Sequence, residues 1–211
     1  LGSGSIATGT FDSQKNVTET YAQQYLVSIT SLVVGGSSSS RGGWYNASSN
    51  VILTETNDSG WGYGGWSGSG SGAYTGSNDT YTLNVAGPII EQPVFLPALT
   101  LAASSGGSMS YSYGSSSGQV NQGETTTLYL PSGTQVSLTT TPASFLNAFQ
   151  QWSDNSSDSS STLNMKVLSP SHLEAQFGYN FENIALIGGI PMVAIVLAMV
   201  LLHFRKHGAK E

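Results

Sequence analysis

The chain has 211 residues, contains no cysteine, and only 9% of its residues are charged. Six basic and twelve acidic residues give a formal net charge of −6 at pH 7, which disfavours nucleic acid as a partner. Without cysteine there are no disulfides and no thiolate chemistry, and the length suits one or two small domains. Because few groups titrate, the charge changes little with pH, and we expect an acidic external medium, as around some archaeal cells.

Residues 1–24 are polar and are predicted to form an N-terminal arm that ends in a short helix near residues 18–24. Runs of β-branched and aromatic residues then predict strands, which cover residues 25–29, 44–45, 50–54, 80–85 and 89–95. Gly35–Gly43 is predicted to be a flexible loop, and the Gly, Ser and aromatic segment 57–76 carries no predicted strand.

A second set of elements follows in the same order. Its predicted strands cover residues 99–102, 126–130, 136–140, 162–165 and 172–177. A Gly/Ser loop is predicted at 104–118, and a short apolar patch, 145–149, precedes Trp152.

The two sets of elements indicate an internal repeat. The spacing from Trp44 to Trp66 equals that from Leu130 to Trp152, TLNV at 82–85 matches TLNM at 162–165, and Glu91 aligns with Glu174. Chance similarity between Ser-rich strands is the alternative. The repeat predicts an all-β ectodomain with two tandem small modules, the first module at residues 25–97 and the second module at residues 98–179.

These motifs resemble the divergent InlB B-repeat, also called the bacterial repeat domain, a β-module found in tandem on bacterial and archaeal surface proteins. The clearer match is residues 133–177, and residues 43–95 match with a longer Gly-rich insertion. The resemblance implies spacing, adhesion or assembly outside the cell, without catalytic residues. The overall plan also resembles that of membrane-anchored stalk proteins of archaeal surface layers (S-layers), although no coiled-coil heptads precede Ile184.

Ile184–Phe204 contains no Asp, Glu, Lys or Arg. At ~1.5 Å per residue this stretch is long enough for a single transmembrane helix across a ~30 Å hydrocarbon core. Basic residues follow it at once in the tail 205–211, so the positive-inside rule predicts a cytoplasmic C-terminus and an extracellular N-terminus in the cell membrane. The alternative is a buried core helix of a soluble protein.

Few residues suggest chemistry. Asp58 opens an Asp-Ser-Gly triplet like that of aspartic proteases but has no second carboxylate partner, and His172 fits one face of a strand. Residues 154–158 offer oxygens to Ca²⁺ but lack the Gly and Glu of an EF-hand loop. His203 and His207 lie beside basic residues, where snorkelling is expected. We therefore predict no catalytic residue, no metal site, no cofactor and no enzyme.

Other residues suggest contacts. Trp66 and Trp152 occupy equivalent repeat positions and are expected to pack in the core, whereas Trp61 and Tyr63 are freer to form a contact patch. Asn-X-Ser/Thr sequons make five residues candidates for N-glycosylation, of which we expect at least two to carry glycans: Asn16, Asn46, Asn57, Asn78 and Asn155.

Small residues four apart in the span allow another helix to approach, with lipid-facing filler as the alternative. They are Ala185, Gly189, Ala194 and Ala198. The sequence as a whole predicts a non-catalytic, single-pass membrane-anchored glycoprotein of the cell surface, with a structural, scaffold or interaction role near a surface layer. The alternative is an accessory subunit of a larger respiratory or transport complex. Expected partners are the lipid bilayer and other membrane or surface-layer proteins.

Overall fold

The computed structural model describes residues 18–153 and 159–187. Within these ranges the chain consists of short strands and one helical segment at 181–187, so the predicted all-β class is confirmed. No helix in the described ranges has the length and apolarity needed to span a bilayer. The predicted span Ile184–Phe204 lies outside the described residues except for residues 184–187.

The first module contains eight strands and the beginning of a ninth. They are β1 (Gln24–Ile29), β2 (Leu32–Val33), β3 (Gly36–Ser38), β4 (Gly43–Asn46), β5 (Asn50–Leu53), β6 (Glu55–Asn57), β7 (Trp61–Gly70), β8 (Tyr81–Asn84) and β9 (Ile89–Ala103). The helix expected near residues 18–24 is wrong, because residues 18–23 form no helix and Gln24 already belongs to β1. Residues 18–23 are exposed, so a helix this short would have no packing partner to stabilise it.

The second module contains the rest of β9 and seven further strands. These are β10 (Gly107–Tyr113), β11 (Ser116–Val120), β12 (Thr125–Tyr129), β13 (Thr134–Pro142), β14 (Asn147–Trp152), β15 (Thr162–Val167) and β16 (Ser171–Tyr179). The loop predicted at 104–118 is wrong, since its residues form the β10–β11 hairpin. Gly and Ser have low intrinsic strand propensity, but cross-strand pairing overrides it here.

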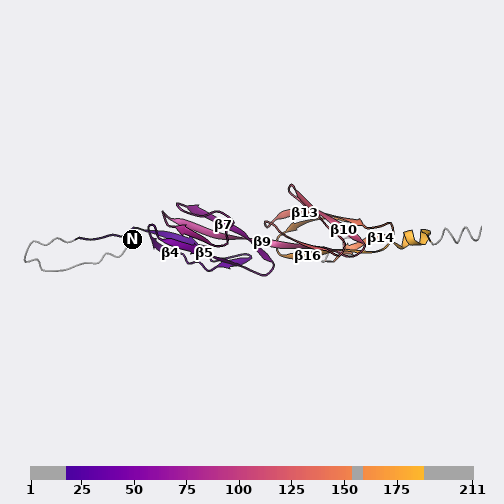
Figure 1. The fold of residues 1–211 in the computed structure, drawn as a ribbon, viewed down its shortest axis with the longest axis horizontal. Coiled ribbons are helices and arrows are strands. Elements are labelled where there is room, and N and C mark those ends of the chain that lie inside the picture. The colour runs from indigo at the N-terminus through magenta and orange to yellow at the C-terminus, as the bar shows by residue number, and fades with distance from the viewer. Residues whose placement is uncertain (1–17, 154–158, 188–211) are drawn as a thin grey trace, which may run out of the picture.

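Strand β9 is shared by both modules, and the boundary predicted between residues 97 and 98 lies inside it. Its first part pairs with β1 in parallel and with β7 in antiparallel orientation, and its second part pairs with β16 in parallel and with β12 in antiparallel orientation. The same order of four strands therefore occurs twice, as β7-β9-β1-β4 and as β14-β16-β9-β12. Figure 1 shows two lobes lying end to end, with β9 where they meet.

Smaller sheets cover this long sheet. β5 pairs with β8, and β13 pairs with β15 and β10. Val51 lies opposite Leu83 in the first module, and Leu138 lies opposite Leu163 in the second. Leu83 and Leu163 belong to the TLNV and TLNM strands that the repeat aligned in the sequence.

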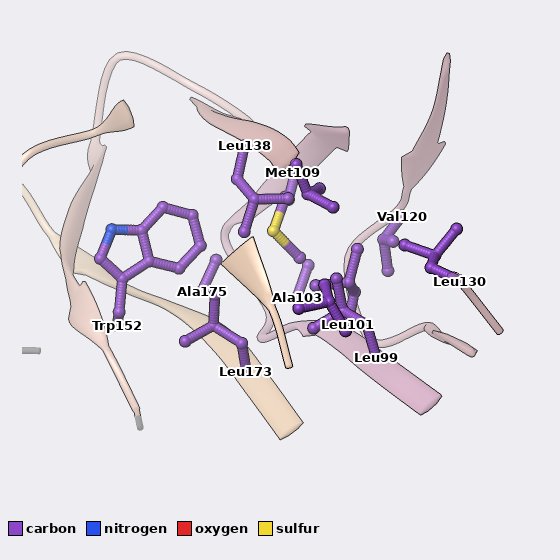
Figure 2. Close-up of a cluster of buried hydrophobic side chains, with 12 residues drawn as sticks. Leu99, Leu101, Ala103, Met109, Val120, Leu130, Leu138, Trp152, Leu173 and Ala175 are labelled. Carbon is purple, nitrogen blue, oxygen red and sulfur yellow. The ribbon is translucent and has the colours of Figure 1, made fainter. Parts of the chain in front are cut away.

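Each module has its own apolar core. The core of the first module consists of Val27, Val51, Leu53, Trp66, Leu83, Val85 and Ile89. The core of the second is larger and consists of Leu99, Leu101, Ala103, Met109, Val120, Leu130, Val136, Leu138, Trp152, Val167, Leu173 and Ala175. Figure 2 shows side chains from opposite layers of the second module pointing toward one another. Because alternate residues of a strand share a face, one face of β9 contributes to both cores, with Ile89 in the first and Leu101 in the second.

Candidate functional site

The residues considered for catalysis lie apart from one another. Asp58 is exposed in the turn between β6 and β7, where its backbone N–H donates to Gly35 O. His172 is exposed on β16 in the other module. Among the described residues no group of three or more His, Cys, Asp or Glu is arranged to hold a metal ion. The loop 154–158 and both tail histidines lie outside the described residues.

The tryptophans divide by burial. Trp66 and Trp152 are each 2% exposed, which confirms the prediction that they pack in the cores. Trp44 on β4 is 65% exposed. Trp61 and Tyr63 are half-buried, and the Tyr63 hydroxyl donates to Asn78 O at 2.8 Å, which fixes Tyr63 to the loop between β7 and β8. A contact patch formed by these two residues stays a prediction.

Three of the five sequons lie in the described part of the chain, and all three asparagines are exposed. Asn46 Oδ1 accepts a hydrogen bond from Gln24 Nε2, and Asn57 Nδ2 donates to Trp61 O. Asn78 lies in the loop between β7 and β8, and we regard it as the most accessible acceptor of the three. Asn16 and Asn155 lie outside the described residues.

A buried acid lies in the first module, and sequence reasoning missed it. Glu91 on β9 is 0% exposed; its Oε1 accepts the Tyr74 backbone N–H at 2.6 Å, and its Oε2 has no partner among the described residues. A Cβ at Gly68, the residue opposite, would come within 2.7 Å of both carboxylate oxygens. Burial raises the pKa of Glu91, against a smaller lowering by the Tyr74 hydrogen bond.

A second acid of the first module, Glu55, also has a shifted pKa. Burial, and secondarily the charge of Asp79, raises the pKa of Glu55. Burial and the charge of Glu55 likewise raise the pKa of Tyr63. Each of these acids is therefore harder to ionise in the folded chain than in water.

The junction between the modules is packed and contains no linker. Ala98 N donates to Gly60 O at 2.9 Å, so β9 remains paired through the boundary. The Tyr129 ring of β12 lies against Gly62 of β7, where an added Cβ would come within 2.5 Å of a ring atom. A Cβ at Gly60 would come within 2.9 Å of Pro170. These glycines allow segments of the second module to contact the first closely.

We expect Gly62→Ala to lower the free energy of unfolding by about 1–3 kcal/mol, because the new methyl group would displace the Tyr129 ring. Urea denaturation of Gly62→Ala, Tyr129→Ala and the double variant would measure the coupling. The alanine at position 62 should cost less in the Tyr129→Ala background. Equal costs in both backgrounds would contradict the close contact.

The end of the second module farthest from the first carries exposed apolar side chains, which we call the apolar end face. They come from the turn before β14, the end of β16 and the helical segment, and each is at least 37% exposed. The members are Phe145, Leu146, Tyr179, Phe181, Ile184, Leu186 and Ile187. Figure 1 shows the helical segment at this end of the molecule. A contiguous exposed apolar surface usually marks contact with a partner or a membrane.

Hydrogen bonds fix the helical segment to the module. Asn180 N donates to Leu146 O at 2.8 Å, and Asn183 Nδ2 donates to Phe145 O at 2.8 Å. Asn180 also caps the helix, since its Oδ1 accepts the Asn183 backbone N–H at 3.1 Å. The chain therefore leaves the module in a defined direction. The sequence contained the signal for this face, because the patch 145–149 and the start of the span are both apolar, but nothing in the sequence showed that they meet.

Of the residues proposed for helix packing, Ala185 is exposed on the helical segment. Gly189, Ala194 and Ala198 lie outside the described residues.

Comparison with known proteins gives one match at the level of a family. The family model of the divergent InlB B-repeat domain matches residues 25–90, which confirms the resemblance for the first module. The match does not include residues 133–177, where the sequence motifs predict the clearer similarity. No curated protein matches the chain.

Solved structures give only distant similarities. The major pilin from Streptococcus pyogenes has 9% sequence identity and a TM-score of 0.27, over 66% of this chain and 75% of that chain. The major pilin protein T-13 from Streptococcus pyogenes serotype GAS131465 has 12% identity and a TM-score of 0.24, over 62% of this chain and 65% of that chain. Similarities this weak support no argument about function.

Proposed function

We propose that this chain, with its divergent InlB B-repeat at residues 25–90, is a non-catalytic single-pass membrane protein that holds two β-modules outside the cell. Its role is structural, as a scaffold or spacer that presents surfaces to other proteins near a surface layer. The domain match supports the general statement that the chain is a surface or structural protein.

The apolar end face carries this proposal. It surrounds the point at which the chain enters the uncharged stretch Ile184–Phe204, and basic residues follow that stretch. Exposed Tyr and Phe side chains suit the interface between water and lipid, where an aromatic ring is partly desolvated and a hydroxyl stays hydrated. An apolar end resting on the headgroup region would place the first module farthest from the membrane.

Arginine substitution in the apolar stretch tests the anchor. We expect Val196→Arg combined with Val200→Arg to release the full chain from membranes on alkaline washing, whereas the unaltered chain stays in the pellet. An arginine near the helix centre, as at position 196, costs about 2.5–3.5 kcal/mol of insertion free energy, and the arginine at position 200 adds a smaller cost because it lies nearer the cytoplasmic end. The measurement is the fraction of protein that sediments with the membranes.

The matched control carries leucine at positions 196 and 200 and should remain bound. Release of the unaltered chain, or retention of the arginine variant, would contradict the anchor. Protease treatment of intact cells tests orientation, since the modules should be cleaved and the tail 205–211 protected.

An accessory subunit of a larger membrane complex is the second candidate. The exposure of Ala185 on the helical segment favours it, because a small exposed residue allows a neighbouring helix to approach. Particles purified in mild detergent would then contain stoichiometric polytopic partners. Co-extraction with a lattice protein, or recovery of the chain alone, would favour the scaffold role.

A further inference from the structure

We propose that each module is a tension-bearing clamp, in which hydrogen bonds between a parallel first and last strand resist stretching of the chain from its ends. The inference deepens the proposed spacer role, since a membrane anchor at one end and a contact at the other would pull on both ends. The clamp itself depends only on the described strands.

The first module is closed by β1 and β9. Val27 lies opposite Ile89, and the parallel pairing covers three registered positions. Thr30 N extends the ladder by donating to Glu91 O at 2.9 Å. The chain enters the module in β1 and leaves it in β9, so these two neighbours carry the load directly.

The second module repeats this arrangement with more pairs. Here β9 is the entering strand and β16 the leaving strand, and five registered positions run from Ser171 opposite Leu99 to Ala175 opposite Ala103. Ser104 continues the contact, since its N–H donates to Ala175 O at 3.0 Å and its Oγ accepts the Phe177 N–H at 2.9 Å.

Parallel orientation decides how the ladder fails. Tension pulls the entering strand toward its N-terminal end and the leaving strand toward its C-terminal end, so the two parallel strands slide along each other. The hydrogen bonds run across the strands, and all of them are loaded together. Had the two strands been antiparallel with both ends at one edge, tension would open the bonds one at a time. Because β9 belongs to both clamps, force passes between modules without a linker to extend.

The direction of pulling provides the sharpest test, because the chain has no cysteine and introduced cysteines define the attachment points. In the full chain in detergent, Thr100→Cys with Tyr179→Cys loads the β9–β16 pair along its length. Thr100→Cys with His172→Cys is the matched control, because these residues are register partners and the pull peels the pair from one end. We expect the first pair to sustain a several-fold higher rupture force in optical tweezers. Equal forces along the two axes would overturn the proposal.

Pulling from the chain ends tests the sequence of events. The first module, with the shorter clamp, should yield first and release roughly 200 Å of contour, followed by roughly 240 Å from the second. Thr30→Pro removes the Thr30 donor and should lower only the first rupture force, whereas Thr30→Ala keeps the donor and should leave it unchanged.

A first rupture force that is unchanged in Thr30→Pro would contradict the clamp in the first module. Should this variant fail to fold, as shown by circular dichroism, the comparison of pulling axes still decides the proposal. None of these measurements needs a bilayer, so failure of the membrane anchor and failure of the clamp are distinguished.

Discussion

Trp152→Ala is expected to lower the free energy of unfolding of the second module by about 3–5 kcal/mol. Trp152 is 2% exposed, and its ring packs against Phe149 with centroids 5.0 Å apart. Its indole Nε1 donates to Ser160 O at 3.0 Å, so alanine would leave a cavity and would also remove this hydrogen bond. Urea denaturation followed by circular dichroism would measure the loss.

Two comparisons control this result. Trp44→Ala, at a site 65% exposed, should change stability by no more than about 0.5 kcal/mol. Trp66→Phe should cost about 1 kcal/mol less than Trp152→Phe, because Trp66 Nε1 has no hydrogen-bond partner in the described part of the chain. Similar losses at positions 44 and 152 would show that the second core is not assembled as described.

Glu91→Gln is expected to stabilise the chain by about 1–3 kcal/mol at pH 7, because it removes a buried charge that has one unpaired oxygen. The Gln amide oxygen can still accept the Tyr74 N–H. Burial raises the pKa of Glu91 above its ordinary value of 4.5. Above the raised pKa both folded and unfolded chains are ionised, and the destabilisation is fully present.

The sign of the pH dependence follows from this shift. As the pH falls through the raised pKa of Glu91, the folded chain takes up a proton first and gains stability relative to its unfolded state. Below 4.5 both states are protonated, so the advantage of the glutamine variant should vanish. Unfolding midpoints measured from pH 7 to pH 4 test this. The control is Glu174→Gln on β16, at a half-buried site. If the stabilisation by Glu91→Gln instead grew as the pH fell, the raised pKa of Glu91 would be contradicted.

This pH dependence bears on the expected acidic medium. Because the pKa values of Glu55 and Glu91 are raised in the folded chain, both acids make the first module more stable relative to its unfolded state as the pH falls. Their contribution acts in the same direction as the scarcity of titratable groups across the chain.

The sequence predicts the order of the repeated strands correctly, but its alignment of Glu91 with Glu174 is wrong by one residue. The tryptophan of each module lies opposite Pro93 in the first and opposite Ala175 in the second. Glu91 lies two residues before Pro93, and Leu173 lies two residues before Ala175. Glu91 is therefore the structural equivalent of the core residue Leu173, and not of Glu174. A shift of one residue moves a side chain to the other face of a strand, and only the pairing reveals it.

The sequence by itself determined the all-β class, the recurring order of the strands and the burial of Trp66 and Trp152, because alternation and spacing are local properties of the chain. It also contains the uncharged stretch on which the anchor proposal rests. The tertiary structure alone decided that one strand serves both modules, that Gly-rich β7 is a long paired strand, and that Glu91 lies in a core. These features depend on which distant segments pair, and neither composition nor periodicity specifies the partner of a strand.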